Sequence, residues 1–505
     1  MKNSIALYGR WTGLALCALL LAVSGCAAPR MAVGPDMTDP AASDAVIAAD
    51  LTHFPQDLSV YAERAGDMPL LDTVRQTEED ARFNRRFFTP WNRKSPVRGP
   101  EEVFEALGAM NPASGYAENL RPIDPTRWQA IAANANREGY AGKGGGYVPG
   151  ITVKTAHLRR LPTAMPFFLY PRRAGEGFPF DYLQNSVLWV GTPVGITHRS
   201  KDGAWVYVET SLVCGWLPVD DVAAVSEAFM AYWQGAPLAV VIRDTVVLAD
   251  RSAGRDAVSG VPLPAVAHIG TVLPLDPEMG GRANPVVLFP ARDASGNALV
   301  RRASLSPEDA APKPLPLTPR VIAAVGNGMM GQPYGWGGMF GNRDCSSAMH
   351  DLFAPFGIWL PRNSQAQGAL GTQLTVTGLS SEEKEARILA EGVPFFSLVR
   401  MRGHVGLYLG GYPHNGKTVP VMFHNIWGVR VLDPEKTGPD GQPLSGRAVI
   451  GKAVVTSLRP GAEHPNIASP ASLLDRIDGL AVLPESGPKS GPESRPQPAS
   501  GERGR

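Results

Sequence analysis

Cysteine is scarce in this chain, since its 505 residues contain only four. So few cysteines exclude a scaffold held together by disulfides. An excess of charge of one sign is also absent, because 48 Lys and Arg residues face 47 Asp and Glu residues and leave a net charge of +1. A protein that binds nucleic acid presents a basic surface to the phosphates, so this balance excludes a polyanion-binding function.

Only one apolar run approaches the length of a membrane segment, and it lies at the N-terminus. Lys2 and Arg10 precede an apolar stretch over residues 11–22, and about 12 residues cannot span ~30 Å of hydrocarbon. This order is typical of a signal peptide. The stretch leads into Ser24-Gly25-Cys26, which resembles the bacterial lipobox.

The lipobox resemblance implies that Cys26 is lipidated and anchors the chain to a membrane, facing the periplasm. Ala27 after the cysteine favours the outer membrane, although the inner membrane stays open. An ordinary signal peptide that happens to contain Cys26 is the alternative. No later segment reaches about 18 uncharged apolar residues, so we expect the remainder of the chain to be soluble and exported.

The composition predicts several folded domains. Hydrophobic residues make up 44% of the chain, and one core rarely exceeds ~250–300 residues. Helical periodicity gives way to short β-prone runs, and a mixed pattern follows a proline-rich stretch. We predict an α+β protein with a lipoprotein signal peptide (1–25), a tether (26–50), a helical module (51–141), two small β-barrels (150–224 and 228–306), a Pro-rich linker (312–319), a mixed domain (320–460) and a disordered tail (484–505).

Only one of the four cysteines remains as a candidate nucleophile. Cys17 is lost with the signal peptide and Cys26 would carry lipid, which leaves Cys214 and Cys345. A free thiol in an oxidising compartment is a liability unless it has a function. Cys214 lies in a strand-like run without a nearby histidine, as expected of a small apolar filler.

Cys345 has the setting of a reactive thiol. Asp344 before it is a good N-cap, and apolar residues follow at helical spacing. The cysteine therefore falls in the first turn of a helix, where unpaired N–H groups and the helix dipole favour a thiolate. We expect a lowered pKa at Cys345; a buried apolar role is the alternative.

Histidines downstream supply candidate bases. His404 begins a strand-like run in which Gly406 leaves room for a helix end to approach. His424 lies in a second such run and can orient the base, whereas His414 lies in a turn. Cys345, His404 and His424 could also bind a metal, but no Cys-x-x-Cys or His-x-x-x-His pair supports this, so we expect neither metal nor cofactor.

Four motifs together resemble those of the NlpC-type cell-wall cysteine peptidases, which have a permuted papain-like core. They are Tyr334-Gly335-Trp336-Gly337-Gly338, Asp344-Cys345-Ser346, Leu360-Pro361-Arg362-Asn363-Ser364-Gln365 and Gly403-His404-Val405-Gly406. The resemblance implies that Cys345 is the nucleophile, His404 the general base and His424 the third member, with Tyr334 near the oxyanion site. The spacing from His404 to His424 is wider than in compact members, so Asn425 and His414 stay open as third members.

The preceding regions are similar to domains found in the same family. The two barrels resemble bacterial SH3 domains, with Gly215-Trp216-Leu217-Pro218 as a closing strand, and the helical module is similar to a stabilising segment. Such enzymes cut the γ-D-glutamyl bond to diaminopimelate or lysine in muropeptides that have a free N-terminal L-Ala. The positions that bind the substrate amine and its surroundings match Asp344, Ser346 and Ser364, with Tyr207 and Glu209 as candidate contributions from the SH3 domain.

Two other functions stay open at this point. The first is a different papain-like chemistry, such as an N-acetylmuramoyl amidase or another acyl transfer, which would use the same nucleophile in a different cleft. The second is a non-catalytic lipoprotein that binds the cell wall, although an intact Cys345 and His404 argue against it. In each reading the partners are peptidoglycan stem peptides or muropeptides and, through the lipid, a membrane.

Overall fold

The computed structural model describes residues 49–171, 175–250, 265–279, 284–437, 443–462 and 472–484. The predicted signal peptide, the lipidation site at Cys26, the tether up to residue 48 and the tail from residue 485 lie outside the described residues. Within those ranges, no helix has the length and apolar character needed to cross a membrane.

The N-terminal part is helical, as predicted. Asp57, Asp72 and Asp124 act as N-caps, because their side chains accept hydrogen bonds from N–H groups of the first turns. The helices are α2 (Leu58–Ala65), α3 (Thr73–Phe87), α4 (Pro100–Val103), α5 (Glu105–Ala109) and α6 (Pro125–Asn134), with the 3₁₀ turns η1 (Thr89–Asn92), η2 (Pro112–Ser114), η3 (Arg137–Gly139) and η4 (Gly142–Gly144).

These helices do not form a separate core. Leu58 is buried within the core of the C-terminal domain, Phe83 with residues of the second β unit, and Trp128 with residues of the first β domain. The predicted helical module therefore runs along the other domains and is stabilised by them.

The first predicted barrel is a seven-stranded antiparallel sheet with the order β3-β2-β6-β5-β4-β1-β7. Gly215–Pro218, expected to be a closing strand, is β6; it pairs with β2 and β5 and buries Trp216 completely. The strands are β1 (Val148–Thr152), β2 (Ala156–Arg159), β3 (Gln184–Leu188), β4 (Pro193–Arg199), β5 (Trp205–Glu209), β6 (Gly215–Pro218) and β7 (Val222–Ala224), with η5 (Val219–Asp221) before the last.

The second β unit begins with a helix, α7 (Glu227–Gly235), and its strands surround one hydrophobic cluster. Among the described residues they form a three-stranded sheet, β11-β8-β14, and two pairs, β10-β9 and β12-β13. The strands are β8 (Leu238–Val241), β9 (Val246–Leu248), β10 (Ala265–Ala267), β11 (Val272–Pro274), β12 (Val286–Arg292), β13 (Ala298–Ser304) and β14 (Ala310–Pro312). Because β14 pairs with β8, this unit extends beyond the predicted boundary at residue 306.

The predicted proline-rich linker is bound to its neighbours. The N–H of Leu315 donates to Pro355 over 2.9 Å, and the carbonyl of Leu317 accepts from Leu70 over 2.9 Å. Leu317 itself is buried, and the ammonium of Lys313 pairs with Asp80. This segment is therefore part of an interface between α3 and the C-terminal domain.

The C-terminal domain contains a six-stranded sheet with the order β15-β20-β16-β17-β18-β19. Its elements are α8 (Pro319–Asn327), η6 (Trp336–Gly341), α9 (Cys345–Phe353), η7 (Ala354–Phe356), α10 (Ser364–Gly368), β15 (Thr372–Thr375), α11 (Ser381–Glu391), β16 (Ser397–Met401), β17 (His404–His414), β18 (Lys417–Thr437), β19 (Pro443–Ser457), η8 (Leu474–Arg476) and β20 (Ile477–Val482).

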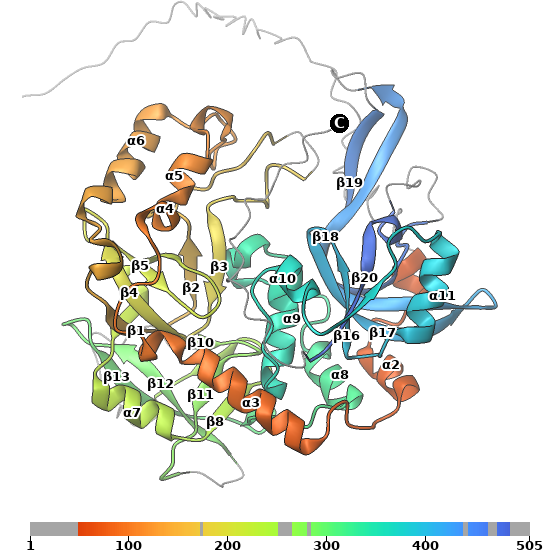
Figure 1. Cartoon of the computed structure of the whole chain (residues 1–505), viewed down its shortest axis with the longest axis horizontal. Helices are drawn as coiled ribbons and strands as arrows, with labels where there is room; N and C mark the ends of the chain where they lie inside the picture. Colours follow the sequence, from red (N-terminus) through yellow and green to blue (C-terminus); the bar gives the residue numbers. More distant parts are fainter. Residues whose placement is uncertain are drawn as a thin grey trace, which may run out of the picture. The chain divides into compact units, whose positions relative to one another are not determined.

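Helices cover both faces of this sheet. Leu407 is buried in one cluster with residues of α9, and the next residue, Tyr408, is buried in a second cluster with Ile388 of α11. This alternation follows from the two-residue period of a strand. Figure 1 shows α9 and α10 on one side of the sheet and α11 on the other.

The predicted boundary of this domain at residue 460 is wrong. Strand β20 follows it in the sequence, yet it lies between β15 and β16 and pairs with both. Strand β20 is therefore the element that connects β15 to the rest of the sheet. The apolar run Leu480-Ala481-Val482 is typical of a strand, but it lies close to the polar tail.

Candidate active site

Cys345 is the first residue of α9, as predicted. Its predecessor Asp344 is the N-cap and accepts the N–H of Ser347 over 2.9 Å. Cys345 is buried, and it belongs to the same hydrophobic cluster as Val405 of β17. The start of α9 therefore meets the start of β17.

The pKa of the Cys345 thiol is raised, whereas the sequence predicted a lowered pKa. Burial raises the pKa of Cys345 to about 12, and the adjacent Asp344 carboxylate adds to this rise. Hydrogen bonding from the main chain of Val405 favours the thiolate but does not compensate. The helix N-terminus alone thus does not yield a stable thiolate, and Cys345 rests as a neutral thiol.

Two histidines face each other, and one of them, His404, directly precedes Val405, whose main chain is hydrogen-bonded to the Cys345 thiol. Nε2 of His404 lies 2.9 Å from Nδ1 of His424, and both side chains are buried. Burial and the nearby Arg476 lower the pKa of His404 to about 3. Burial, with His404 next to it, also holds the pKa of His424 well below its ordinary value. Both imidazoles are therefore neutral at pH 7.

The long spacing between these histidines is accounted for by a β-hairpin. Strands β17 and β18 are antiparallel, and Leu407 pairs with Phe423. Gly406 is needed here, because a Cβ at this position would lie 3.0 Å from the Cβ of His424 and 3.0 Å from the carbonyl oxygen of Phe423. The glycine predicted to admit a helix end thus admits the second histidine.

The other two candidates for the third position have different partners. Asn425 donates its side-chain amide to the carbonyl of Arg343 over 2.8 Å. His414 lies at the far end of β17, roughly 30 Å along the strand from His404, where its ring packs against His53 and Phe54. Among the three, the structure pairs His424 with His404.

Asp344 is held by an arginine that the sequence motif contained without an assigned role. Arg362 contacts both carboxylate oxygens of Asp344, at 3.0 and 2.6 Å, and donates to Ser346 over 3.0 Å. Arg362 and Ser346 are buried as well. The Asp344 charge, predicted to meet a substrate ammonium, is therefore already paired within the protein.

The remaining predicted binding residues lie close to this pair in the chain or in space. Ser364 is the first residue of α10 and is half-buried. Tyr334 is half-buried, and burial together with the neighbouring Cys345 raises the pKa of its hydroxyl well above the ordinary value. Tyr334 thus lies within electrostatic range of the thiol.

Strand β3 of the first β domain contacts this region directly. Ser186 accepts a hydrogen bond from Nε of Arg362 over 2.8 Å, and Gln184 donates to the carbonyl of Gly337 over 3.0 Å. The two candidate contributions from this domain have other partners in the structure. Tyr207 packs on Trp216 within the domain, and the Glu209 carboxylate accepts from the main chain of residues 97 and 98.

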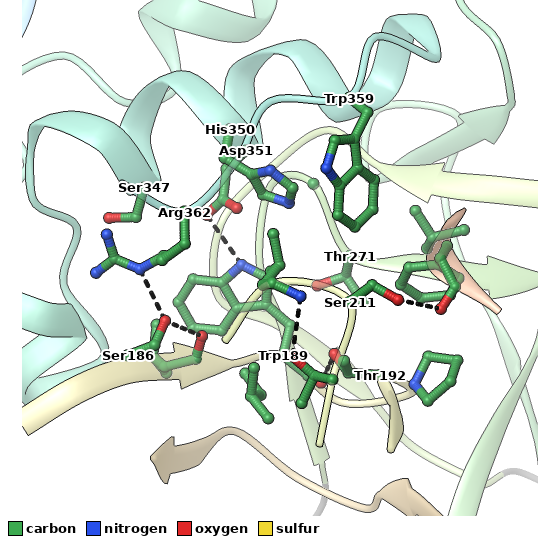
Figure 2. Close-up of a pocket in the computed structure, with 18 of the residues that line it drawn as sticks. Ser186, Trp189, Thr192, Ser211, Thr271, Ser347, His350, Asp351, Trp359 and Arg362 are labelled. Atoms are coloured by element: carbon green, nitrogen blue, oxygen red, sulfur yellow. Dashed lines mark hydrogen bonds between the residues drawn. The ribbon is translucent and has the colours of Figure 1, made fainter. Parts of the chain in front are cut away.

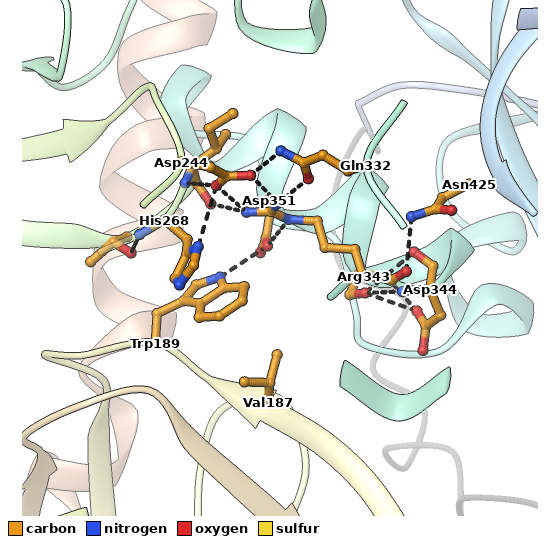
Figure 3. A network of polar contacts seen from close by, with 12 residues as sticks. Val187, Trp189, Asp244, His268, Gln332, Arg343, Asp344, Asp351 and Asn425 are labelled. Carbon is orange, nitrogen blue, oxygen red and sulfur yellow. Dashed lines mark hydrogen bonds and ion pairs between the residues drawn. The ribbon is translucent and has the colours of Figure 1, made fainter. Parts of the chain in front are cut away.

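A buried polar network anchors the residue that precedes the N-cap (Figure 3). Arg343 contacts both oxygens of Asp244, at 2.7 and 3.0 Å, and its Nε lies 2.6 Å from Asp351 of α9. Trp189 of the first β domain donates to the same Asp351 oxygen over 2.9 Å. Arg343 therefore joins α9 to both preceding β units, a role that its sequence gives no sign of.

A pocket lies on another side of α9 (Figure 2). Its walls come from α3, the first and second β units and the C-terminal domain. Cys345, His404 and His424 do not line it, so it is separate from the thiol. Its lining residues include Phe83, Phe87, Ser186, Trp189, Thr192, Ser211, Thr271, Ser347, His350, Asp351, Trp359 and Arg362.

Across the described ranges, no group of three or more His, Cys, Asp or Glu residues is arranged to hold a metal ion. Both described cysteines are free thiols.

A neutral thiol beside a neutral, oriented imidazole is suited to nucleophilic attack coupled to proton transfer.

Comparisons with known proteins match three segments. Residues 14–140 match the N-terminal stabilising domain of NLPC_P60 proteins, residues 166–218 an SH3 domain of the SH3b1 type, and residues 331–426 the NlpC/P60 family. No curated protein matches the chain.

Solved structures give a similar result. A structure described as a novel NlpC/P60 endopeptidase from Photobacterium damselae subsp. piscicida is 25% identical, covering 86% of this chain and 98% of its own, with a TM-score of 0.74. An NlpC/P60 family protein from Bacillus cereus is 18% identical, covering 66% of this chain and 100% of its own, with a TM-score of 0.41.

Proposed function

Because the chain contains an NlpC/P60 domain and is a cysteine peptidase of this cell-wall type, we propose that it cleaves the γ-D-glutamyl bond to the diamino acid in peptidoglycan stem peptides. Cys345 is the nucleophile, His404 the general base and His424 the residue that orients the base. The observation that carries this proposal is the His404–His424 hydrogen bond on a strand whose next residue, Val405, is hydrogen-bonded through its main chain to a cysteine at a helix N-terminus.

The proposed reaction proceeds through a thioester. The sulfur of Cys345 attacks the γ-carbonyl carbon of D-glutamate while its proton passes to Nδ1 of His404, because Nε2 is engaged by His424. The protonated His404 then gives this proton to the amine of the leaving diamino acid as the C–N bond breaks. Water, deprotonated by His404, hydrolyses the thioester and restores the thiol.

Selection for a free N-terminal L-Ala is the finer part of this proposal. A substrate ammonium near Asp344 would share a carboxylate that already carries two hydrogen bonds from Arg362. A blocked substrate therefore leaves no unpaired charge at Asp344. We propose that the selection is steric and depends on β3, which packs against the loop at Gly337 and supports Arg362 through Ser186.

Defined muropeptides test this function. The protein is incubated with L-Ala-γ-D-Glu-diaminopimelate, with its lysine analogue and with the same peptides joined to muramic acid, and products are identified by mass spectrometry. Release of the dipeptide L-Ala-D-Glu supports the proposal. Release of the intact stem peptide from the sugar would show an N-acetylmuramoyl amidase, and equal rates on free and sugar-linked peptides would contradict steric selection at the N-terminus.

The proposed site of action is the periplasm, with a lipid on Cys26 as the anchor. The support is the order of basic residues, apolar stretch and Ser24-Gly25-Cys26 in the sequence. Mass spectrometry of the N-terminal peptide from membranes would detect acylated Cys26. Recovery of an unmodified chain that retains residues 1–25, or that is cleaved elsewhere, would overturn this part.

A further inference from the structure

Thr456 on β19 lies directly behind the second histidine. Its side chain is fully buried, and its Oγ1 lies 3.1 Å from Nε2 of His424. The same oxygen lies 2.7 Å from the main-chain carbonyl oxygen of Ser457. A hydroxyl has one proton to donate, and a carbonyl oxygen can only accept. The Thr456 hydroxyl therefore donates to Ser457 and accepts the Nε2–H of His424.

This arrangement fixes the protons on both imidazoles. A neutral imidazole with its hydrogen on Nε2 has a lone pair on Nδ1, so Nδ1 of His424 accepts the Nε2–H of His404 across 2.9 Å. His404 is left with an unprotonated Nδ1. Burial keeps both rings neutral, as the lowered pKa values of His404 and His424 indicate, so one tautomer of each ring satisfies the whole chain of hydrogen bonds.

We propose that Thr456 is a positioning residue that, through its single hydroxyl proton, sets the tautomers of His424 and His404 so that Nδ1 of His404 is free to take the Cys345 proton. This inference rests on the catalytic roles proposed for the three residues. The Thr456 hydroxyl contacts His424 and the main chain of Ser457, so it acts through the two histidines.

Removal of the hydroxyl should reverse the proton order. In Thr456→Val the Nε2–H of His424 faces a methyl group, and a buried donor without an acceptor is costly. A shift of this proton to Nδ1 of His424 restores a partner only if Nε2 of His404 becomes the acceptor. His404 must then carry its hydrogen on Nδ1, which blocks the proton transfer from Cys345.

The test combines kinetics with a direct measurement of tautomers in the intact protein. Thr456→Val should lower kcat roughly 10- to 100-fold on L-Ala-γ-D-Glu-diaminopimelate with little change in KM, less than the ~10²- to 10⁴-fold contribution of a general base. Thr456→Ser keeps the hydroxyl and should restore most of the rate. Ser457→Ala, which keeps the carbonyl that Thr456 donates to, should match the wild type.

Imidazole ¹⁵N chemical shifts report which ring nitrogen carries the proton, and a merely structural role for Thr456 would leave them unchanged. We expect protonated Nε2 on both histidines of the wild type and protonated Nδ1 on His404 in Thr456→Val. Protonated Nδ1 on His404 of the wild type would overturn the inference even if the valine variant failed to fold, and so would a fully active valine variant. If that variant is active while His404→Ala is inactive, only the role of Thr456 fails; an active Cys345→Ala would refute the proposed function itself.

Discussion

The substitution Arg343→Met tests whether the buried ion pairs of Arg343 join the domains. Its guanidinium is buried between the carboxylates of Asp244 and Asp351. Methionine fills much of the same volume but leaves both carboxylates without their cation. Loss of one partner of a buried ion pair costs about 3–5 kcal/mol, so we expect the free energy of unfolding to fall by this amount.

The pH dependence of this loss gives a second, independent check. Burial would raise the pKa of Asp244, but the hydrogen bond from His268 and the charge of Arg343 outweigh burial and hold the pKa well below its ordinary value. A carboxyl whose pKa is lowered by folding stabilises the fold above its unfolded pKa of about 3.9 and loses this contribution as the pH falls towards the folded value. The difference between wild type and Arg343→Met should therefore be largest near neutral pH and shrink in acid.

Urea unfolding and calorimetry of the full chain at several pH values measure both effects. The double variant Arg343→Met/Asp244→Asn removes one stranded charge and should recover part of the loss. A loss below about 1 kcal/mol for the single variant at pH 7, or a difference that grows in acid, would refute the reasoning that a buried ion network ties α9 to the second β unit.

Three further predictions concern the reaction. Cys345→Ala should abolish hydrolysis while Cys214→Ala keeps it, and iodoacetamide labelling of Cys345 should become faster well above pH 7, because burial raises its pKa to about 12; fast labelling at pH 7 would refute a neutral resting thiol. His404→Ala should lose nearly as much rate as Cys345→Ala, whereas His424→Ala should retain more, since an orienting group contributes less than the base. A His424→Ala variant with the wild-type rate would contradict the role of His424. Gly406→Ala should lower kcat while the protein stays folded, because the new Cβ would press on His424. Full activity of this variant would refute the close packing of Gly406 against His424.

Local patterns in the sequence predicted the positions of the candidate site residues in the fold well. An N-cap followed by apolar residues at helical spacing placed Cys345 at a helix start, and strand alternation placed His404 and His424 on neighbouring strands. These signals are local, so a window of about ten residues contains them. What the sequence could not supply were partners from distant segments. Thr456 meets His424 only through the pairing of β18 with β19, and the pairing of Arg362 with Asp344 depends on how α10 follows α9.

The same limit explains the errors in the domain plan. The helices before residue 141 have amphipathic faces, which predict a core but not whose core it is. Strand β20 lies between β15 and β16 although it is the last strand in the part of the chain that the structure describes, and no local pattern reports such an insertion. The expected thiolate at Cys345 failed for a similar reason, because the helix N-terminus is visible in the sequence whereas the burial that opposes it is not.

The distribution of the N-terminal helices among other cores has a consequence for the order in which the chain folds. Gln56 exchanges two hydrogen bonds with the main chain of Val455, 399 residues away, and the N–H of Leu58 donates to Asn327. The segment at Gln56 and Leu58 can therefore dock only after the C-terminal domain has formed its sheet. A protease added to nascent or partly unfolded protein should cut there first.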